Sequence, residues 1–152
     1  MKKAIILIIL IIACSVFLYF FQREKQPSVA VLSSGPRTVF LGDKQFSLEI
    51  AATRAERERG LSDRKSLCLG CAMLFVFDKK GTYPFWMKGM QFDLDILWVD
   101  DTRIMQIDRN ISHLAGVAEV RSPKIAVDRV LEINAGESDR LGLKEGDKAI
   151  FK

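Results

Sequence analysis

The chain has 152 residues, of which 49% are hydrophobic, and it carries a formal charge of +4 with a single histidine. This length suits one domain of ordinary size, and the composition excludes intrinsic disorder, a polytopic membrane protein, collagen and a small disulfide-rich scaffold. Beyond position 21 there are 21 basic and 19 acidic residues, a net charge of only +2 there, so the charge does not indicate nucleic-acid binding.

A hydrophobic run occupies positions 4–21, where 17 of 18 residues are apolar and Ser15 is the exception. Such a run spans about 27 Å as a helix, close to the ~30 Å hydrocarbon thickness of a bilayer. It contains no charge, proline or glycine, and no small-residue cleavage pattern interrupts it. We therefore predict a signal anchor in residues 1–25, with a transmembrane helix at about 4–21.

Two alternatives to an uncleaved anchor are a cleaved signal peptide and lipidation at Cys14, which follows a loose lipoprotein-like box. The three residues before the run include Lys2 and Lys3. This short basic segment favours an N-terminus inside the cell and export of the remainder of the chain. We expect a membrane-anchored protein whose globular domain is extracytoplasmic, in the periplasm or at the cell surface.

The segment 26–36 has the composition of a linker, with two prolines, three serines and a glycine around a short apolar patch. The remaining residues, 37–152, are predicted to form a single globular, mainly β domain. Its expected strands, in chain order, are 38–41, 46–50, 73–77, 85–88, 94–99, 103–108, 127–133 and 148–151.

Two short helices interrupt these strands. The first is predicted by the capping box of Thr53 and Glu56 and ends at Gly60, and the second lies at about 137–141. A polar loop is expected at about 109–124. The pattern favours an α+β, mainly β fold: a compact, barrel-like antiparallel sheet with two short helices, preceded by the transmembrane helix.

Five segments carry a family resemblance. They are RGLSDRKSL (59–67), AMLFVF (72–77), FWMKGMQFDLDILWVD (85–100), VLEINAG (130–136) and GLKEGD (142–147). Their order is similar to that in the domain of unknown function 192 family. The resemblance implies a compact, mostly β domain that is often exported, and it implies no agreed activity.

The chain departs from the family pattern at four positions. Ala72 replaces a usual glycine, Gly89 and Met90 replace Asn-Thr, and Asp93 replaces a proline. If the Asn or Thr side chain does chemistry in relatives, this chain has lost it.

Cys68 and Cys71 form a C-x-x-C pair. A zinc site would need further ligands, and the other candidates are Cys14 in the hydrophobic run and His113. A redox dithiol usually precedes a helix, whereas this pair precedes an apolar strand. We favour a local disulfide, which suits an oxidising compartment, over free thiols or catalytic redox activity.

Strand alternation in the segment 83–90 predicts that Trp86 and Lys88 share one side, with Phe85 and Met87 on the other. An exposed aromatic ring beside a cation suits a sugar ring or an acidic ligand. The alternative is that Trp86 belongs to the core and Lys88 reaches past it to water.

Asp95 and Arg129 interrupt apolar strand faces, and both are candidates for ligand binding. Because a buried carboxylate needs a partner, an ion pair of Asp95 with Arg129 or Lys88 is a specific hypothesis. The alternative is a structural carboxylate that caps a neighbouring turn. Glu132 lies on the opposite face from Arg129, where we expect exposure or a local pair, and it is a weaker candidate for ligand binding.

His113 is expected to be a solvated loop histidine, because no nucleophile elbow or other catalytic motif accompanies it. Phosphate-binding, zinc-protease and EF-hand motifs are absent from the sequence, so we predict neither a metal nor a cofactor.

Three functions follow from these residues. The first is a non-catalytic, membrane-tethered module that binds a small molecule, glycan or envelope protein through Trp86, Lys88 and Asp95. The second is an envelope enzyme that uses Lys88 and Asp95 as an acid–base pair. The third is a thiol–disulfide redox protein that uses Cys68 and Cys71.

Overall fold

The computed structural model describes residues 35–152. The predicted anchor at 4–21 and all but the last two residues of the predicted linker lie outside this range. Within the described residues, no helix has the length and apolar character needed to cross a membrane.

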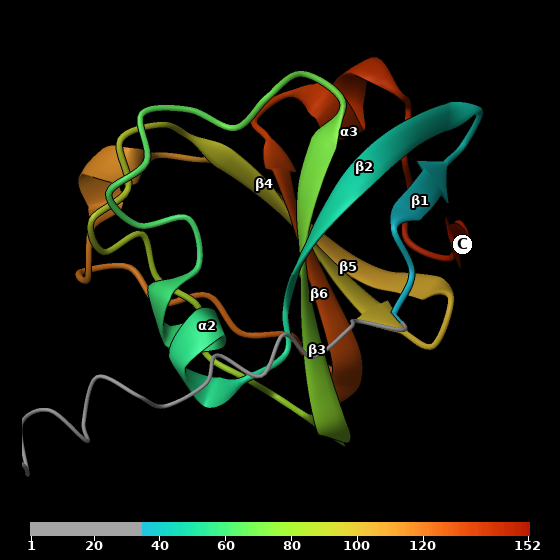
Figure 1. The fold of residues 1–152 in the computed structure, drawn as a ribbon, viewed down its shortest axis with the longest axis horizontal. Helices are drawn as coiled ribbons and strands as arrows, with labels where there is room; N and C mark the ends of the chain where they lie inside the picture. Colours follow the sequence, from blue (N-terminus) through green and yellow to red (C-terminus); the bar gives the residue numbers. More distant parts are fainter. Residues whose placement is uncertain (1–34) are drawn as a thin grey trace, which may run out of the picture. The chain divides into compact units, whose positions relative to one another are not determined.

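The fold is mainly β. Seven strands form one sheet, curled into a half-barrel, in the order β5-β4-β6-β3-β2-β1-β7. In Figure 1 the strands cross near the middle of the molecule and fan out from there. Their bounds are β1 (Thr38–Leu41), β2 (Lys44–Ala51), β3 (Cys71–Gly81), β4 (Leu94–Asp100), β5 (Arg103–Ile111), β6 (Val127–Asn134) and β7 (Ala149–Phe151).

The sheet is mixed, which corrects the prediction of an antiparallel sheet. β2 and β3 pair in parallel, in a register that runs from Ser47 opposite Cys71 to Ala51 opposite Phe75. The other strand pairs are antiparallel. The parallel pair arises because residues 52–70 form a crossover that returns the chain to the start of β2, as a parallel connection requires.

The two edges of the sheet approach each other at one end. Arg103 of β5 forms an isolated bridge with Lys148, just before β7. The amide of Gly146 donates to the carbonyl of Ile104 over 2.7 Å, and the amide of Ile104 donates to the carbonyl of Asp147 over 2.9 Å. These bonds satisfy part of the backbone that an open edge would leave unpaired.

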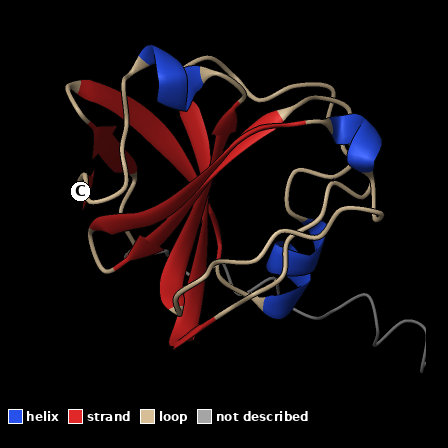
Figure 2. Ribbon diagram, turned by 180° about the vertical axis from the view of Figure 1, so that it is seen from behind, coloured by secondary structure: helices blue, strands red, loops and turns tan. Residues whose placement is uncertain are grey.

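The helical segments lie around the outside of the sheet (Figure 2). They are α2 (Arg54–Arg59), a 3-10 turn (His113–Ala115) and α3 (Glu137–Arg140). The predicted capping box is confirmed: the Thr53 hydroxyl accepts from the Glu56 amide, and the Glu56 carboxylate accepts from the Thr53 amide over 2.8 Å. Gly60 ends α2 at φ 50°, where a Cβ would lie 3.2 Å from the Phe75 ring.

Apolar side chains are buried on both faces of the sheet. The inner cluster includes Leu74, Leu97 and Leu131, and the outer cluster includes Phe75 and Trp98. Because both faces are covered, β4 is buried along nearly its whole length, which explains its continuous apolar sequence.

The predicted strand at 85–88 is wrong. Its only strand-like feature is a single bridge between Phe85 and Arg121. The predicted alternation nevertheless holds, because Met87 is buried whereas Trp86 and Lys88 are exposed.

The predicted disulfide is confirmed. Cys68 and Cys71 are bonded across a turn that passes through Gly70, and Cys71 begins β3. The side-chain amide of Asn134 donates to the carbonyls of Leu67 and Cys68 over 3.2 and 3.3 Å, which holds this turn against the end of β6.

Loss of this disulfide should have a modest effect. Because the closed loop is so short, the Cys68→Ser/Cys71→Ser variant is expected to lose about 1.5 kcal/mol of unfolding free energy. Urea unfolding of the full-length chain checks this value. Reductant should destabilise the wild type by the same amount and leave the double variant unchanged. An equal effect of reductant on both proteins would contradict a contribution from this bond.

Candidate functional site

Two carboxyl groups are buried in residues 35–152, one on each face of the sheet. Asp95 lies on the face of the inner cluster, since its neighbours Leu94 and Ile96 belong to the outer one. Glu132 lies on the outer face, because Leu131 and Ile133 on either side of it belong to the inner cluster. Their surroundings differ, and so do their roles.

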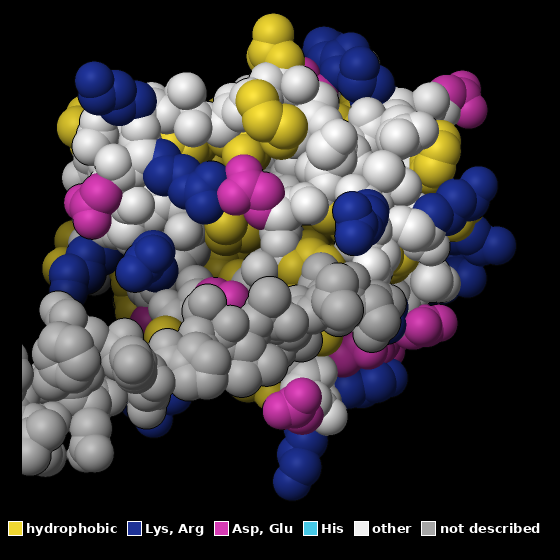
Figure 3. All heavy atoms as spheres, viewed as in Figure 1, with side chains coloured by type: hydrophobic (Ala, Val, Ile, Leu, Met, Phe, Trp, Pro, Cys, Tyr) yellow, Lys and Arg dark blue, Asp and Glu magenta, His cyan; other side chains and the backbone are white. Residues whose placement is uncertain are grey.

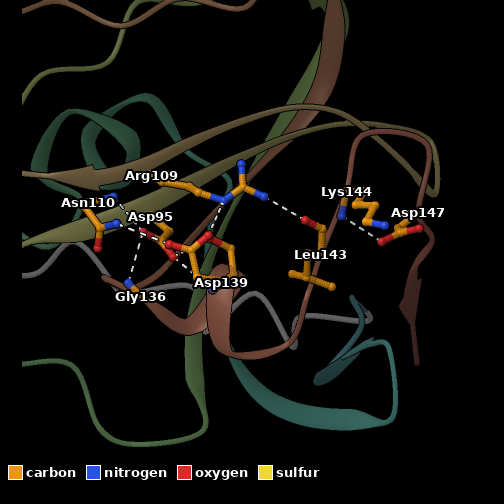
Figure 4. Close-up of polar contacts among 9 residues, drawn as sticks. Asp95, Arg109, Asn110, Gly136, Asp139, Leu143, Lys144 and Asp147 are labelled. Atoms are coloured by element: carbon orange, nitrogen blue, oxygen red, sulfur yellow. Dashed lines mark hydrogen bonds and ion pairs between the residues drawn. The ribbon is translucent and has the colours of Figure 1, made fainter.

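Asp95 is fully buried and hydrogen-bonded through both oxygens (Figure 4). Oδ1 accepts from the backbone amides of Asn110, at 2.8 Å, and Gly136, at 3.2 Å. Oδ2 accepts from the amide and the hydroxyl of Ser138, at 2.9 and 2.5 Å. This carboxylate therefore fixes the first turn of α3 and the end of β5 to β4.

The predicted ion pair of Asp95 with Arg129 or Lys88 is wrong. The register places Arg129 opposite Val99, four residues along β4 from Asp95. Its guanidinium donates to the Asp101 carbonyl and lies 3.6 Å from the Asp101 carboxylate. The alternative interpretation, a carboxylate that caps a neighbouring turn, is confirmed by the four bonds to Asp95.

Glu132 lies in the middle of the sheet, and its expected exposure is wrong. Its neighbours in register are Met73 on β3 and Ile96 on β4, two apolar residues that leave the side chain 6% exposed. Its Oε2 atom is buried without a hydrogen-bond partner. Burial alone raises the pKa of Glu132 from an ordinary 4.5 to about 8, so this carboxyl is largely neutral at pH 7.

A cleft of about 460 Å³ opens over Glu132. Its walls come from α2, the turn after it, the middle of β3, the loop at 83–90 and Glu132 of β6. The residues that line it are Arg54, Arg57, Glu58, Arg59, Gly60, Leu61, Ser62, Phe75, Phe77, Tyr83, Pro84, Phe85, Trp86, Met90 and Glu132. Of the predicted ligand-binding residues, the cleft thus brings together Trp86 and Glu132, and leaves out Lys88, Asp95 and Arg129.

Aromatic rings form much of the lining. Phe77 and Tyr83 stack with centroids 3.6 Å apart, and Phe85 packs edge-on against Phe75 at 4.9 Å. Trp86 is 45% exposed, so it does not belong to the core as the alternative interpretation held. The four rings of Phe75, Phe77, Tyr83 and Phe85 pack against one another and present a pre-formed apolar wall, and Trp86 adds an exposed ring to the lining.

Three of the charged residues at the rim, Arg54, Arg57 and Glu58, have partners within the chain. Arg57 donates to the carbonyls of Ala52 and Val76, the second over 2.9 Å, and its guanidinium lies 5.0 Å from the Phe77 centroid. Arg54 pairs with Glu58 at 2.7 Å. On the face seen in Figure 3, basic and acidic side chains are likewise interspersed, with hydrophobic side chains showing between them.

Three of the positions that depart from the family resemblance, Gly89, Met90 and Asp93, have defined contacts in the structure. Gly89 has φ 71°, and a Cβ there would lie 3.3 Å from the Ser62 side chain, whose hydroxyl donates to the Lys88 carbonyl. Met90 lines the cleft, so an apolar side chain stands at the position where the resemblance implies a threonine. Asp93 pairs with His113 at 2.6 Å, so this histidine is a paired residue at the start of the 3-10 turn.

The family model described as uncharacterized ACR, DUF192, matches residues 37–151. The chain belongs to the DUF192 family. Among curated proteins, none matches it.

Two crystal structures are similar to this chain in fold and sequence. One is a protein of unknown function from Novosphingobium aromaticivorans DSM 12444, with 35% identity, a TM-score of 0.68, and coverage of 76% of this chain and 83% of that one. The other comes from Sinorhizobium meliloti 1021 and is described as a proposed transcription regulator, with 27% identity, a TM-score of 0.69, and coverage of 77% and 92%. The fold of this DUF192 domain therefore recurs in proteins from two other sources.

Proposed function

We propose that this DUF192 protein is a non-catalytic binding module, held outside the cytoplasm by its N-terminal helix, whose cleft over Glu132 binds a small molecule. One observation carries the proposal: a buried carboxyl without a partner faces an aromatic cleft large enough for a compact ligand. Buried polar groups are normally hydrogen-bonded, so an exception inside a cleft marks a position for a ligand group.

Binding is favoured over acid–base catalysis by the positions of Lys88 and Asp95. Asp95 has its acceptor positions occupied by four donors and lies on the other face of the sheet from Glu132. Lys88 is exposed and does not line the cleft. The two side chains therefore do not meet at one position where both could exchange a proton with the same substrate.

The sequence supports the proposed location. The uncharged run at 4–21 is long enough for a bilayer, and the disulfide suits an oxidising compartment outside the cytoplasm. The membrane is thus the first proposed partner, and a small molecule of the cell envelope is the second. A redox role for Cys68 and Cys71 is less favoured, because the pair precedes a strand and no helix dipole acts on it.

Calorimetric titration with tryptophol, a neutral indole alcohol, tests the proposal on the full-length chain in lipid nanodiscs. Empty nanodiscs supply the blank. We expect saturable binding that is weakened at least fivefold by Trp86→Ala, because that ring forms the exposed wall of the cleft.

The matched control is Leu69→Ala, which removes a 90% exposed apolar side chain that does not line the cleft. This variant should bind tryptophol like the wild type. Heats equal to the nanodisc blank for tryptophol and for its cationic and anionic analogues, or equal affinities of Trp86→Ala and the wild type, would contradict the proposal.

A further inference from the structure

We propose that the cleft selects organic cations: the ligand carries a protonated amine that binds the Glu132 carboxylate, while its apolar body lies against the aromatic wall. This inference rests on the proposed function and names the class of ligand. Three features of the structure support it.

The first is the state of the Glu132 carboxyl group. Its Oε2 atom has no donor, and the neighbouring strands offer only Met73 and Ile96 on either side. A carboxylate accepts its strongest hydrogen bonds from charged donors, and an ammonium group brings up to three N–H donors. The partner that Glu132 lacks in the chain is therefore one that an amine supplies.

The second is the aromatic lining. Phe75, Phe85 and Trp86 line the same cleft as this carboxyl. Ring faces attract cations, and more strongly when water is excluded. A carboxyl group among aromatic rings thus favours an ammonium group over a neutral or anionic one.

The third is the absence of a competing cation from the chain's described residues. No ion pair within residues 35–152 includes Glu132. At the rim, Arg57 donates to two backbone carbonyls and Arg54 pairs with Glu58, while Arg59 is exposed. Burial is the one cause of the raised pKa of Glu132, so none of these arginines stabilises its charged form.

The rim arginines offer the main counterargument, because they attract anions. An anionic ligand could pair with exposed Arg59, but its contact would be solvent-screened. Its body would then leave Glu132 without a partner at the floor of the cleft. Ligands of opposite charge therefore distinguish the two arrangements.

The proton balance gives a second signature. Glu132 of the free protein holds a proton at pH 7, since its pKa is about 8. When an ammonium ion binds, the carboxyl ionises to form the pair and its proton passes to the buffer. Up to one proton is therefore released per amine bound, and amine affinity rises between pH 6 and pH 8.

The experiment compares three indoles that share one apolar body: tryptamine (cation), tryptophol (neutral) and indole-3-propionate (anion). Each is titrated calorimetrically into the full-length chain in nanodiscs at pH 7.5, in two buffers of different ionisation enthalpy. We expect tryptamine to bind at least tenfold more tightly than tryptophol, with proton release, and indole-3-propionate to bind most weakly.

Glu132→Gln should remove the tryptamine advantage and the proton release, while changing tryptophol affinity by less than threefold. Glu119→Gln, at an exposed carboxylate that pairs with Arg121 at 2.8 Å, is the control and should leave all three affinities unchanged. The amine inference would be overturned if tryptophol bound as tightly as tryptamine, or if indole-3-propionate bound most tightly of the three. Either result would leave the proposed binding function standing. Absence of binding by all three would overturn both.

Discussion

Asp95→Ala is expected to lower the free energy of unfolding by about 3–5 kcal/mol. The substitution removes one carboxylate and leaves three backbone amides and the Ser138 hydroxyl without their acceptor. Each unpaired buried donor costs about 1–3 kcal/mol. Water that enters the space left by the carboxylate offsets part of this cost by accepting hydrogen bonds from these donors. α3 and the end of β5 should loosen together, because Asp95 bonds to both.

Urea unfolding, followed by tryptophan fluorescence on the full-length chain, measures this loss. The matched control is Asp139→Ala, which removes an exposed carboxylate that pairs with Arg109 at 2.7 Å (Figure 4). An exposed pair of this kind contributes about 1 kcal/mol or less. Equal stabilities of the two variants would show that Asp95 does not hold the sheet to α3.

The wild-type protein is also expected to lose stability as the pH rises from 4.5 to 8, relative to Glu132→Gln. The folded state raises the pKa of Glu132 from 4.5 to about 8, so between these values the folded chain holds a proton that the unfolded chain has released. Folding is therefore favoured at low pH, and this contribution falls by up to about 1.4 kcal/mol per pH unit. Below pH 4.5 it is fully present, and above pH 8 it is gone.

Unfolding free energies of the two proteins at pH 5, 6, 7, 8 and 9 test this expectation. The stability of Glu132→Gln minus that of the wild type should increase by about 3–5 kcal/mol from pH 5 to pH 8 and then level off. Because Gln does not titrate, the difference isolates Glu132 from the other ionisable groups. A difference that is constant with pH would contradict the burial of a neutral carboxyl.

Local patterns predicted most of the secondary structure. The capping box of Thr53 and Glu56, the glycine at position 60 and the apolar runs of β3 and β4 each act through neighbouring residues, and their elements are found in the structure. The parallel pairing of β2 with β3 was missed, because pairing depends on the path of the whole crossover at 52–70. Alternation within one strand carries no information on the direction of its neighbour.

The candidate site was predicted less well. Trp86 and the position of Asp95 among apolar residues were recognised. The partners of Asp95 were not, because Asn110 lies on β5 and Gly136 and Ser138 lie at the start of α3, more than 40 residues away. Glu132 was expected to be exposed, because alternation on β6 identifies its face and does not show that the outer face is also covered. The signal was present in VLEIN, where a single carboxyl interrupts an apolar strand of a sheet that is buried on both faces.

The central claim is that Glu132 is a neutral carboxyl at the floor of a binding cleft. A ¹³C NMR titration of the side-chain carboxyl carbons tests it most directly, on the full-length chain with labelled glutamate, and the Glu132 signal is identified by its absence in Glu132→Gln. We predict a midpoint near pH 8 for the free protein and a lower midpoint in saturating tryptamine. A midpoint near 4.5 in the free protein would contradict the account, because the carboxyl would then be ionised and solvated at neutral pH.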